Sequence, residues 1–220
     1  MRILREKINR NIFLLFLLFS VLLVMPAFAC YFMPNADVCN FFNSNDYRNA
    51  ISMAIHLAFV SIAMFFLWKN SLHETADSIG FPGKAKSVVV YTCVGLIVIF
   101  IVLFAFTFIS SIFDFNDQDK VFEKVTSLPV YLLFFAIVLA PITEELFFRA
   151  FLTPRIGIIF SSLLFGILHA SYGSVVEIGG AAIIGAVLAV VFTRSKSITP
   201  CILIHMIYNL ISILVMVYVA

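Results

Sequence analysis

Long apolar runs are the feature that most constrains how this chain can fold. Several of them reach the roughly 20 residues that an α-helix needs to cross the hydrocarbon core of a bilayer. Hydrophobic residues make up 63% of the 220 residues and charged residues only 12%, which is about half the charged share of an ordinary soluble domain. The sequence therefore predicts an all-α fold, a polytopic bundle of transmembrane helices.

Seven segments are predicted to span the membrane. Their approximate ranges are 12–32, 50–68, 88–113, 129–152, 156–170, 175–193 and 198–219. The break between the fourth and fifth segments is assigned to Thr153-Pro154-Arg155, because proline ends or kinks a helix. The first segment follows a basic leader, as a signal peptide does, but its length and the further spans favour a transmembrane helix.

The basic residues predict the orientation of the bundle. With a cytoplasmic N-terminus, eleven of the fourteen Lys and Arg residues lie at the inner side, Arg149 among them, and only Arg48, Lys120 and Lys124 lie outside. The positive-inside rule favours this arrangement over its inverse. We expect a multi-pass protein of a prokaryotic inner or plasma membrane, since the chain is small and shows no eukaryotic targeting signal. The basic residues are spread over loops, so nucleic-acid binding is not expected.

The four cysteines show no metal-binding spacing. Cys93 and Cys201 fall within predicted spans, where packing is the simpler interpretation. Cys30 and Cys39 flank a polar loop on the predicted outer side. They could form a disulfide if that compartment is oxidising.

Polar side chains interrupt three of the apolar segments: two acids and an arginine in the fourth, a histidine in the fifth, and a histidine and an amide in the seventh. These residues are Glu144, Glu145, Arg149, His169, His205 and Asn209. Ionisable groups within a span are costly and usually face the bundle interior or a wet cavity. We therefore predict one polar site built by these three segments.

Helical spacing gives the two glutamates different roles. Glu145 and Arg149 are four residues apart, share a helix face and should form an ion pair. Glu144 points about 100° away from that face. It is predicted to be the reactive carboxylate, a general base that activates a water lying between it and His169.

His205 and Asn209 also share a helix face, in the seventh span. Both can donate hydrogen bonds to an oxygen that gains negative charge, as an oxyanion site requires. Together with Glu144 and His169 they provide the parts for peptide hydrolysis. On a straight seven-span bundle His169 lies nearer the outer side than Glu144, so the fifth segment is expected to be tilted or to begin deeper.

Three motifs in this order resemble the signature of a known family. They are Glu144-Glu145-x-x-x-Arg149, Phe165-x-x-x-His169 and His205-x-x-x-Asn209. They are similar to those of the CPBP family of CAAX-prenyl-protease and bacteriocin-processing membrane proteins, also called Abi, which includes the Rce1 prenyl-protein endopeptidases. The resemblance covers about residues 129–209.

The resemblance implies an intramembrane endopeptidase. Glu144 and His169 would activate water, His205 and Asn209 would form the oxyanion site, and Glu145 and Arg149 would support them. The chain would divide into N-terminal spans at 1–128 and a catalytic core at 129–220, joined in a single bundle. The expected partners are the lipid bilayer and a peptide or membrane-protein substrate, such as a bacteriocin leader or a membrane-protein tail. The oligomeric state is left open.

Other interpretations remain. No cofactor is expected, although two histidines and two glutamates could bind zinc; the sequence has no HExxH pair. Intramembrane Glu and His residues also serve as proton relays in transporters, but the second, third and sixth spans offer few polar residues to line a substrate path. A non-catalytic role, such as immunity to a bacteriocin, is compatible with the intact motifs.

Overall fold

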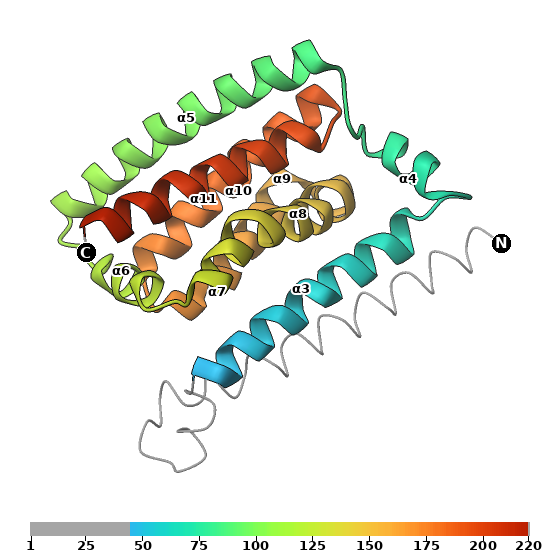
Figure 1. Cartoon of the computed structure of the whole chain (residues 1–220). Coiled ribbons are helices and arrows are strands. Elements are labelled where there is room, and N and C mark those ends of the chain that lie inside the picture. The colour runs from blue at the N-terminus through green and yellow to red at the C-terminus, as the bar shows by residue number, and fades with distance from the viewer. Residues whose placement is uncertain (1–44, 220) are drawn as a thin grey trace. The chain divides into compact units, whose positions relative to one another are not determined.

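The structure is a computed structural model that describes residues 45–219, where helices joined by short loops form the fold and no β-strand occurs (Figure 1). The chain divides into two compact units, residues 1–61 and 62–220, and all six predicted site residues belong to the second. In chain order the elements are α3 (Asn45–Leu67), α4 (Leu72–Ser78), α5 (Ala85–Ile112), α6 (Asp119–Thr126), α7 (Val130–Phe134), η1 (Phe135–Leu139), α8 (Ala140–Glu145), η2 (Leu146–Leu152), α9 (Thr153–Leu168), η3 (His169–Tyr172), α10 (Val175–Ser195) and α11 (Thr199–Val219). The predicted all-α fold is confirmed.

Within residues 45–219, five helical segments are long and apolar enough to cross a membrane. They are Asn49–Leu67, Ala85–Ile112, Val130–Tyr172, Val175–Ser195 and Thr199–Tyr218. The first predicted span, at 12–32, lies outside the described residues, as do Cys30 and Cys39. The predicted fourth and fifth spans together form the single helical run Val130–Tyr172. A multi-pass membrane protein is confirmed, while the count of seven spans and the cytoplasmic N-terminus stay predictions.

The predicted break at residues 153–155 is wrong by two residues. Helix α9 begins at Thr153 and continues through Pro154, and the backbone leaves the helical region at Gly157, with φ 83° and ψ 169°. Only glycine adopts this region readily. A Cβ atom on Gly157 would meet no atom within 4 Å, so the backbone conformation, and not close packing, accounts for glycine here.

Beyond Gly157 the chain folds back on itself. Helix α9 packs against η2, which precedes it in the chain. The hydroxyl groups of Thr153 and Ser161, on either side of the glycine, lie 3.0 Å apart. A straight helix of 43 residues would be about 65 Å long, roughly twice the thickness of the hydrocarbon core. The turn at Gly157 therefore returns the fifth segment beside the fourth.

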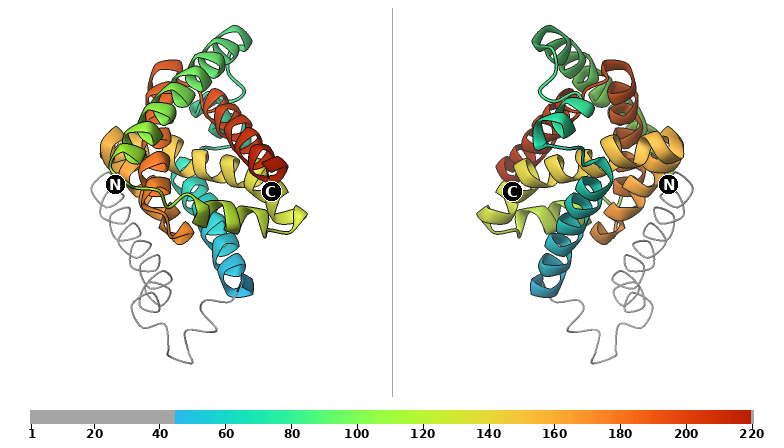
Figure 2. Two further views of the ribbon diagram at one scale, coloured as in Figure 1. Left: turned by 90° about the vertical axis from the view of Figure 1, so that its left-hand side faces the viewer. Right: turned by 90° about the vertical axis from the view of Figure 1, so that its right-hand side faces the viewer.

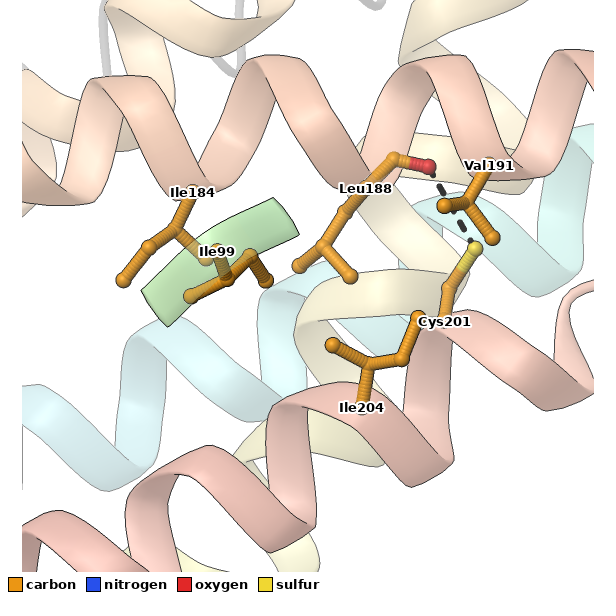
Figure 3. Packing of buried hydrophobic residues seen from close by; sticks show 6 residues of the cluster. All are labelled: Ile99, Ile184, Leu188, Val191, Cys201 and Ile204. Atoms are coloured by element: carbon orange, nitrogen blue, oxygen red, sulfur yellow. Dashed lines mark hydrogen bonds between the residues drawn. The ribbon is translucent and has the colours of Figure 1, made fainter. Parts of the chain in front are cut away.

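An apolar core joins α5, α10 and α11. Figure 3 shows its buried members, which are Ile99, Ile184, Leu188, Val191, Cys201 and Ile204. The thiol of Cys201 donates to the carbonyl of Leu188 over 3.4 Å, so Cys201 is a packing residue as expected. This core fixes α11, which also packs against α8 and η1 (Figure 2). The polar residues of α8 and α11 are thereby held facing each other.

Polar contacts tie the helices together at both ends. At one end the Ser197 hydroxyl donates to the Gly80 carbonyl over 2.6 Å, and the Ile198 N–H donates to the Ile79 carbonyl over 3.0 Å. At the other end the carboxylate of Asp117 accepts hydrogen bonds from the Ser174 hydroxyl and the Val175 N–H, both at 2.6 Å. Asp117 thus caps the start of α10, where the exposed N–H groups attract an acid.

Candidate active site

Two π-helical turns flank the Glu144-Glu145 pair. In η1 and η2 the N–H groups bond five residues back: Ala140 donates to Phe135, and Thr153 donates to Phe148. A proline follows each turn, Pro141 after η1 and Pro154 after η2. Proline has no N–H and its ring crowds the carbonyl four residues earlier, and widening the turn relieves that conflict. Such π-turns occur frequently at functional sites.

Glu145 and Arg149 form a fully buried ion pair, as their spacing predicts. Oε2 of Glu145 lies 2.9 Å from Nε of Arg149, and neither side chain is exposed. The contact lacks the alignment of a hydrogen bond, and both Nη atoms of Arg149 have no hydrogen-bond partner within the described structure. The rings of Phe165 and Phe148 cover the guanidinium, with centroids 4.7 and 5.7 Å from its carbon. Arg149 was expected among the inner-side charges, but it lies inside the protein and should be left out of the orientation count.

His205 lies between the two glutamates. Its Nδ1 atom is 2.9 Å from Oε1 of Glu145, which is hydrogen-bond distance, and its Nε2 atom is 3.8 Å from Oε2 of Glu144. Glu145 is completely buried, whereas 14% of the Glu144 side chain is exposed. Glu145 therefore holds the imidazole, and Glu144 is the carboxylate that remains partly exposed.

The charges of the buried cluster can balance; its members are Glu144, Glu145, Arg149 and His205. A carboxylate can only accept, so Nδ1 of His205 carries a proton and donates a hydrogen bond to Glu145. If Nε2 is also protonated, the cluster holds two carboxylates, one imidazolium and one guanidinium, and its net charge is zero. Charges buried far from water persist only when they are paired in this way.

His169 begins η3, at the far end of α9. Its Nδ1 atom lies 2.8 Å from the carbonyl of Phe165. A carbonyl accepts, so Nδ1 carries the proton and Nε2 of the neutral ring is left as an acceptor. The Phe165 ring contacts both imidazoles, with its centroid 4.8 Å from that of His169 and 5.8 Å from that of His205. The chain turns at Gly157 before it reaches His169, and a fifth segment that is tilted or begins deeper in the membrane stays a prediction.

Asn209 makes a contact that its spacing in α11 did not predict. Its Nδ2 atom donates to the backbone carbonyl of Ala136, in η1, over 2.9 Å. One amide hydrogen is thereby used, and the second is left to point elsewhere. Asn209 thus contacts the helical run that carries Glu144, two turns before that residue.

The structure brings Glu144, Glu145, Arg149 and His205 into one contiguous cluster. It connects His169 to that cluster through Phe165, and Asn209 through the backbone of η1. Between residues 45 and 219, no group of three or more His, Cys, Asp or Glu side chains has an arrangement suited to holding a metal ion. The expected absence of a cofactor stays a prediction.

Two residues at this site, Phe165 and Pro141, were not among the predicted site residues. Phe165, 2% exposed, lies against both imidazoles and the guanidinium, although it was noted only as the start of the second motif. Pro141 has no N–H to donate to a carbonyl of η1. The sequence signal that could have identified Pro141 is a proline within the helical stretch that carries Glu144 and Glu145.

Lys124 of α6 also contacts the η3 turn. Nζ of Lys124 donates to the Ser171 carbonyl over 2.7 Å and lies 4.8 Å from the centre of the Tyr172 ring. The Tyr172 ring is stacked near His169, with centroids 6.1 Å apart and an interplanar angle of 14°. Lys124 therefore holds the short η3 turn that His169 begins.

The fold and the buried cluster define a polytopic membrane protein with paired acids, histidines and an arginine at its centre. Residues 126–211 match the family model of the type II CAAX prenyl endopeptidase Rce1-like proteins. This match confirms the family resemblance that the three motifs predicted, and it contains all six site residues. No curated protein and no solved structure matches the chain. The family is one of membrane proteases, so residues 126–211 form a CAAX-protease-like segment.

Proposed function

We propose that this protein is an intramembrane endopeptidase in which Glu144 activates the attacking water. The observation that carries the proposal is the position of His205 between Glu145 and Glu144. Glu145 and Arg149 are fully buried and serve to fix the imidazole. Glu144 is the member of the cluster that remains partly exposed, as a group that meets water and substrate must be.

The proposed reaction begins with water bound between Glu144 and Nε2 of His169. Glu144 takes a proton from the water, and the water oxygen forms a bond to the carbonyl carbon of the substrate peptide. The carbonyl oxygen becomes an oxyanion that accepts hydrogen bonds from Nε2–H of His205 and the free amide hydrogen of Asn209. When the C–N bond breaks, protonated Glu144 returns its proton to the leaving amine.

The proposed substrate is a peptide or membrane-protein segment that reaches the site from the bilayer of a prokaryotic cell. The experiment uses the full chain in proteoliposomes and quenched fluorescent peptides, each supplied with and without a prenyl group. Wild type is compared with Glu144→Gln, which keeps the shape of the side chain and removes the base. Glu74→Gln, in exposed α4, is the matched control.

We expect cleavage by wild type and by Glu74→Gln, and a loss of at least about 100-fold in Glu144→Gln, because general-base catalysis contributes that much. Cleavage should survive a chelator. Loss of activity on chelation that is restored by zinc would overturn the metal-free mechanism. The opposite outcome is that wild type cleaves none of the peptides while Glu144→Gln still restores whatever phenotype cells lacking the protein show. That result would replace the proposed catalytic function with a non-catalytic role.

A further inference from the structure

The carbonyl of Ala136 is a hydrogen-bond acceptor that the helix itself does not use. In an α-helix it would accept from the N–H of residue 140, but Ala140 donates to Phe135. In a π-turn it would accept from residue 141, which is Pro141 and has no N–H. Both backbone donors are therefore unavailable to it.

Asn209 supplies the missing donor from another helix. Its Nδ2 atom lies 2.9 Å from this carbonyl, 73 residues earlier in the chain. The hydrogen bond is half-buried, and a carbonyl kept from water without a donor costs at most about a lost hydrogen bond, so the contact stabilises the approach of α11 to η1. These two elements are packed against each other, and the hydrogen bond fixes the plane of the Asn209 amide.

We propose that Pro141 is a positioning residue that keeps the Ala136 carbonyl open for Asn209 and so orients the Asn209 amide. With one Nδ2 hydrogen bonded to Ala136, the direction of the other hydrogen is determined. The inference rests on the proposed function only where it assigns that second hydrogen to the oxyanion. The link from Pro141 through Ala136 to Asn209 stands on the backbone geometry alone.

A double-mutant cycle on thermal unfolding tests this link without any substrate. Asn209→Ala is measured in detergent in the wild-type and Pro141→Ala backgrounds. In wild type it should lower Tm by about 5 °C, because the carbonyl loses its donor. In the Pro141→Ala background the shift should be less than half as large, because the new N–H of residue 141 can occupy the carbonyl. Equal shifts in the two backgrounds would overturn the proposal.

Pro154→Ala is the matched control for the cycle. Pro154 follows the other π-turn of the same helical run, and the Ala136 carbonyl does not depend on it. The Tm shift caused by Asn209→Ala should therefore be the same in this background as in wild type. A shift that shrinks equally in the Pro154→Ala background would show a general softening of the helix and would also overturn the proposal.

Peptide-cleavage kinetics of Pro141→Ala provide a second test. Pro141→Ala should lower kcat by about tenfold with little change in KM and no loss of Tm, since alanine suits a helix better than proline. A merely structural proline would instead change Tm and activity together, and full activity in Pro141→Ala would contradict the positioning role. If wild type cleaves no peptide, the proposed function fails, and the unfolding cycle still decides the role of Pro141.

Discussion

The Nδ1 atom of His205 lies 2.9 Å from Oε1 of Glu145, and both side chains are buried in the bundle. This contact distinguishes two glutamates that are neighbours in the sequence. Glu145 pairs with Arg149 on one side and His205 on the other, so both of its oxygens are committed to holding other groups. Glu144 faces the opposite nitrogen of the same imidazole at 3.8 Å.

Breaking the Glu145–Arg149 pair should cost more stability than removing both partners. Glu145→Gln and Arg149→Met each leave one buried charge without its counter-ion, a loss of about 3–5 kcal/mol. The double variant should recover a large part of that loss, because no uncompensated charge is left. Thermal or denaturant unfolding in detergent measures the coupling, with Glu74→Gln as the exposed control. Strictly additive losses would contradict a coupled pair.

Phe165→Leu should reduce peptide cleavage more than it reduces stability. The ring contacts both His169 and His205 and covers the guanidinium of Arg149. Leucine keeps most of the side-chain volume and should lower the free energy of unfolding by only about 1–1.5 kcal/mol. It removes the aromatic ring that contacts the two imidazoles and the guanidinium. We expect kcat to fall about tenfold.

The control for this change is Phe160→Leu, in the same helix but 66% exposed. It should alter neither the rate of cleavage nor Tm appreciably. Equal effects of the two substitutions on kcat would mean that contact with the imidazoles has no particular importance.

Gly166→Ala should displace the helix that carries His169. A Cβ atom there would lie 2.6 Å from the Ile178 carbonyl oxygen and 2.8 Å from Cβ of Ala182, so α9 and α10 would have to separate. Overpacking of this kind costs about 1–3 kcal/mol. At Gly180 the added Cβ would lie 3.7 Å from Leu103, an ordinary contact, and Gly180→Ala is the matched control. Similar Tm values for the two variants would contradict the close approach of α9 to α10.

Stability should depend on the ionisation of Asp117, which lies outside the spans. Burial opposes ionisation of this carboxyl group, but hydrogen bonds from Ser174, Val175 and Val176 and the charge of Lys120 together lower its pKa below the ordinary value of 3.8. The unfolded chain thus binds the proton more tightly than the folded one. The stabilisation is complete above the unfolded pKa and disappears as the pH falls through the folded pKa.

The measurement compares the Tm of wild type and Asp117→Asn between pH 7 and pH 3. The variant should be less stable near neutral pH, and the two curves should begin to converge below about pH 4. Asp119→Asn, an exposed acid of α6, controls for general effects of charge. A difference that stays constant down to pH 3 would contradict the role of the ionised carboxylate as a cap.

The membrane fold and the Glu145–Arg149 ion pair could be predicted from the sequence because each depends on a local pattern. Apolar runs of span length predict helices whatever their neighbours are. The i,i+4 spacing of Glu145 and Arg149 places them on one face before any packing is known. The motif order predicted the family resemblance, which the match over residues 126–211 confirms.

The break near Pro154 was misplaced for a physical reason. Proline usually ends a helix because it removes a hydrogen bond and crowds a carbonyl. Here a π-turn absorbs both effects, and the helix runs on to Gly157. The hydrogen-bond register of a helix around a proline depends on what packs beside it, so residue types alone did not reveal it.

The sequence by itself thus determined that the chain is a bundle of membrane helices and which six polar residues lie within it. Only the tertiary structure decided how they are connected: that His205 joins the two glutamates, that Phe165 contacts both imidazoles, and that Asn209 bonds to the Ala136 carbonyl. Sequence periodicity fixes the face of a helix on which a residue lies. The depth and rotation of one helix against another come from packing, here from the core shared by α5, α10 and α11, and it is packing that brings distant residues within bonding distance.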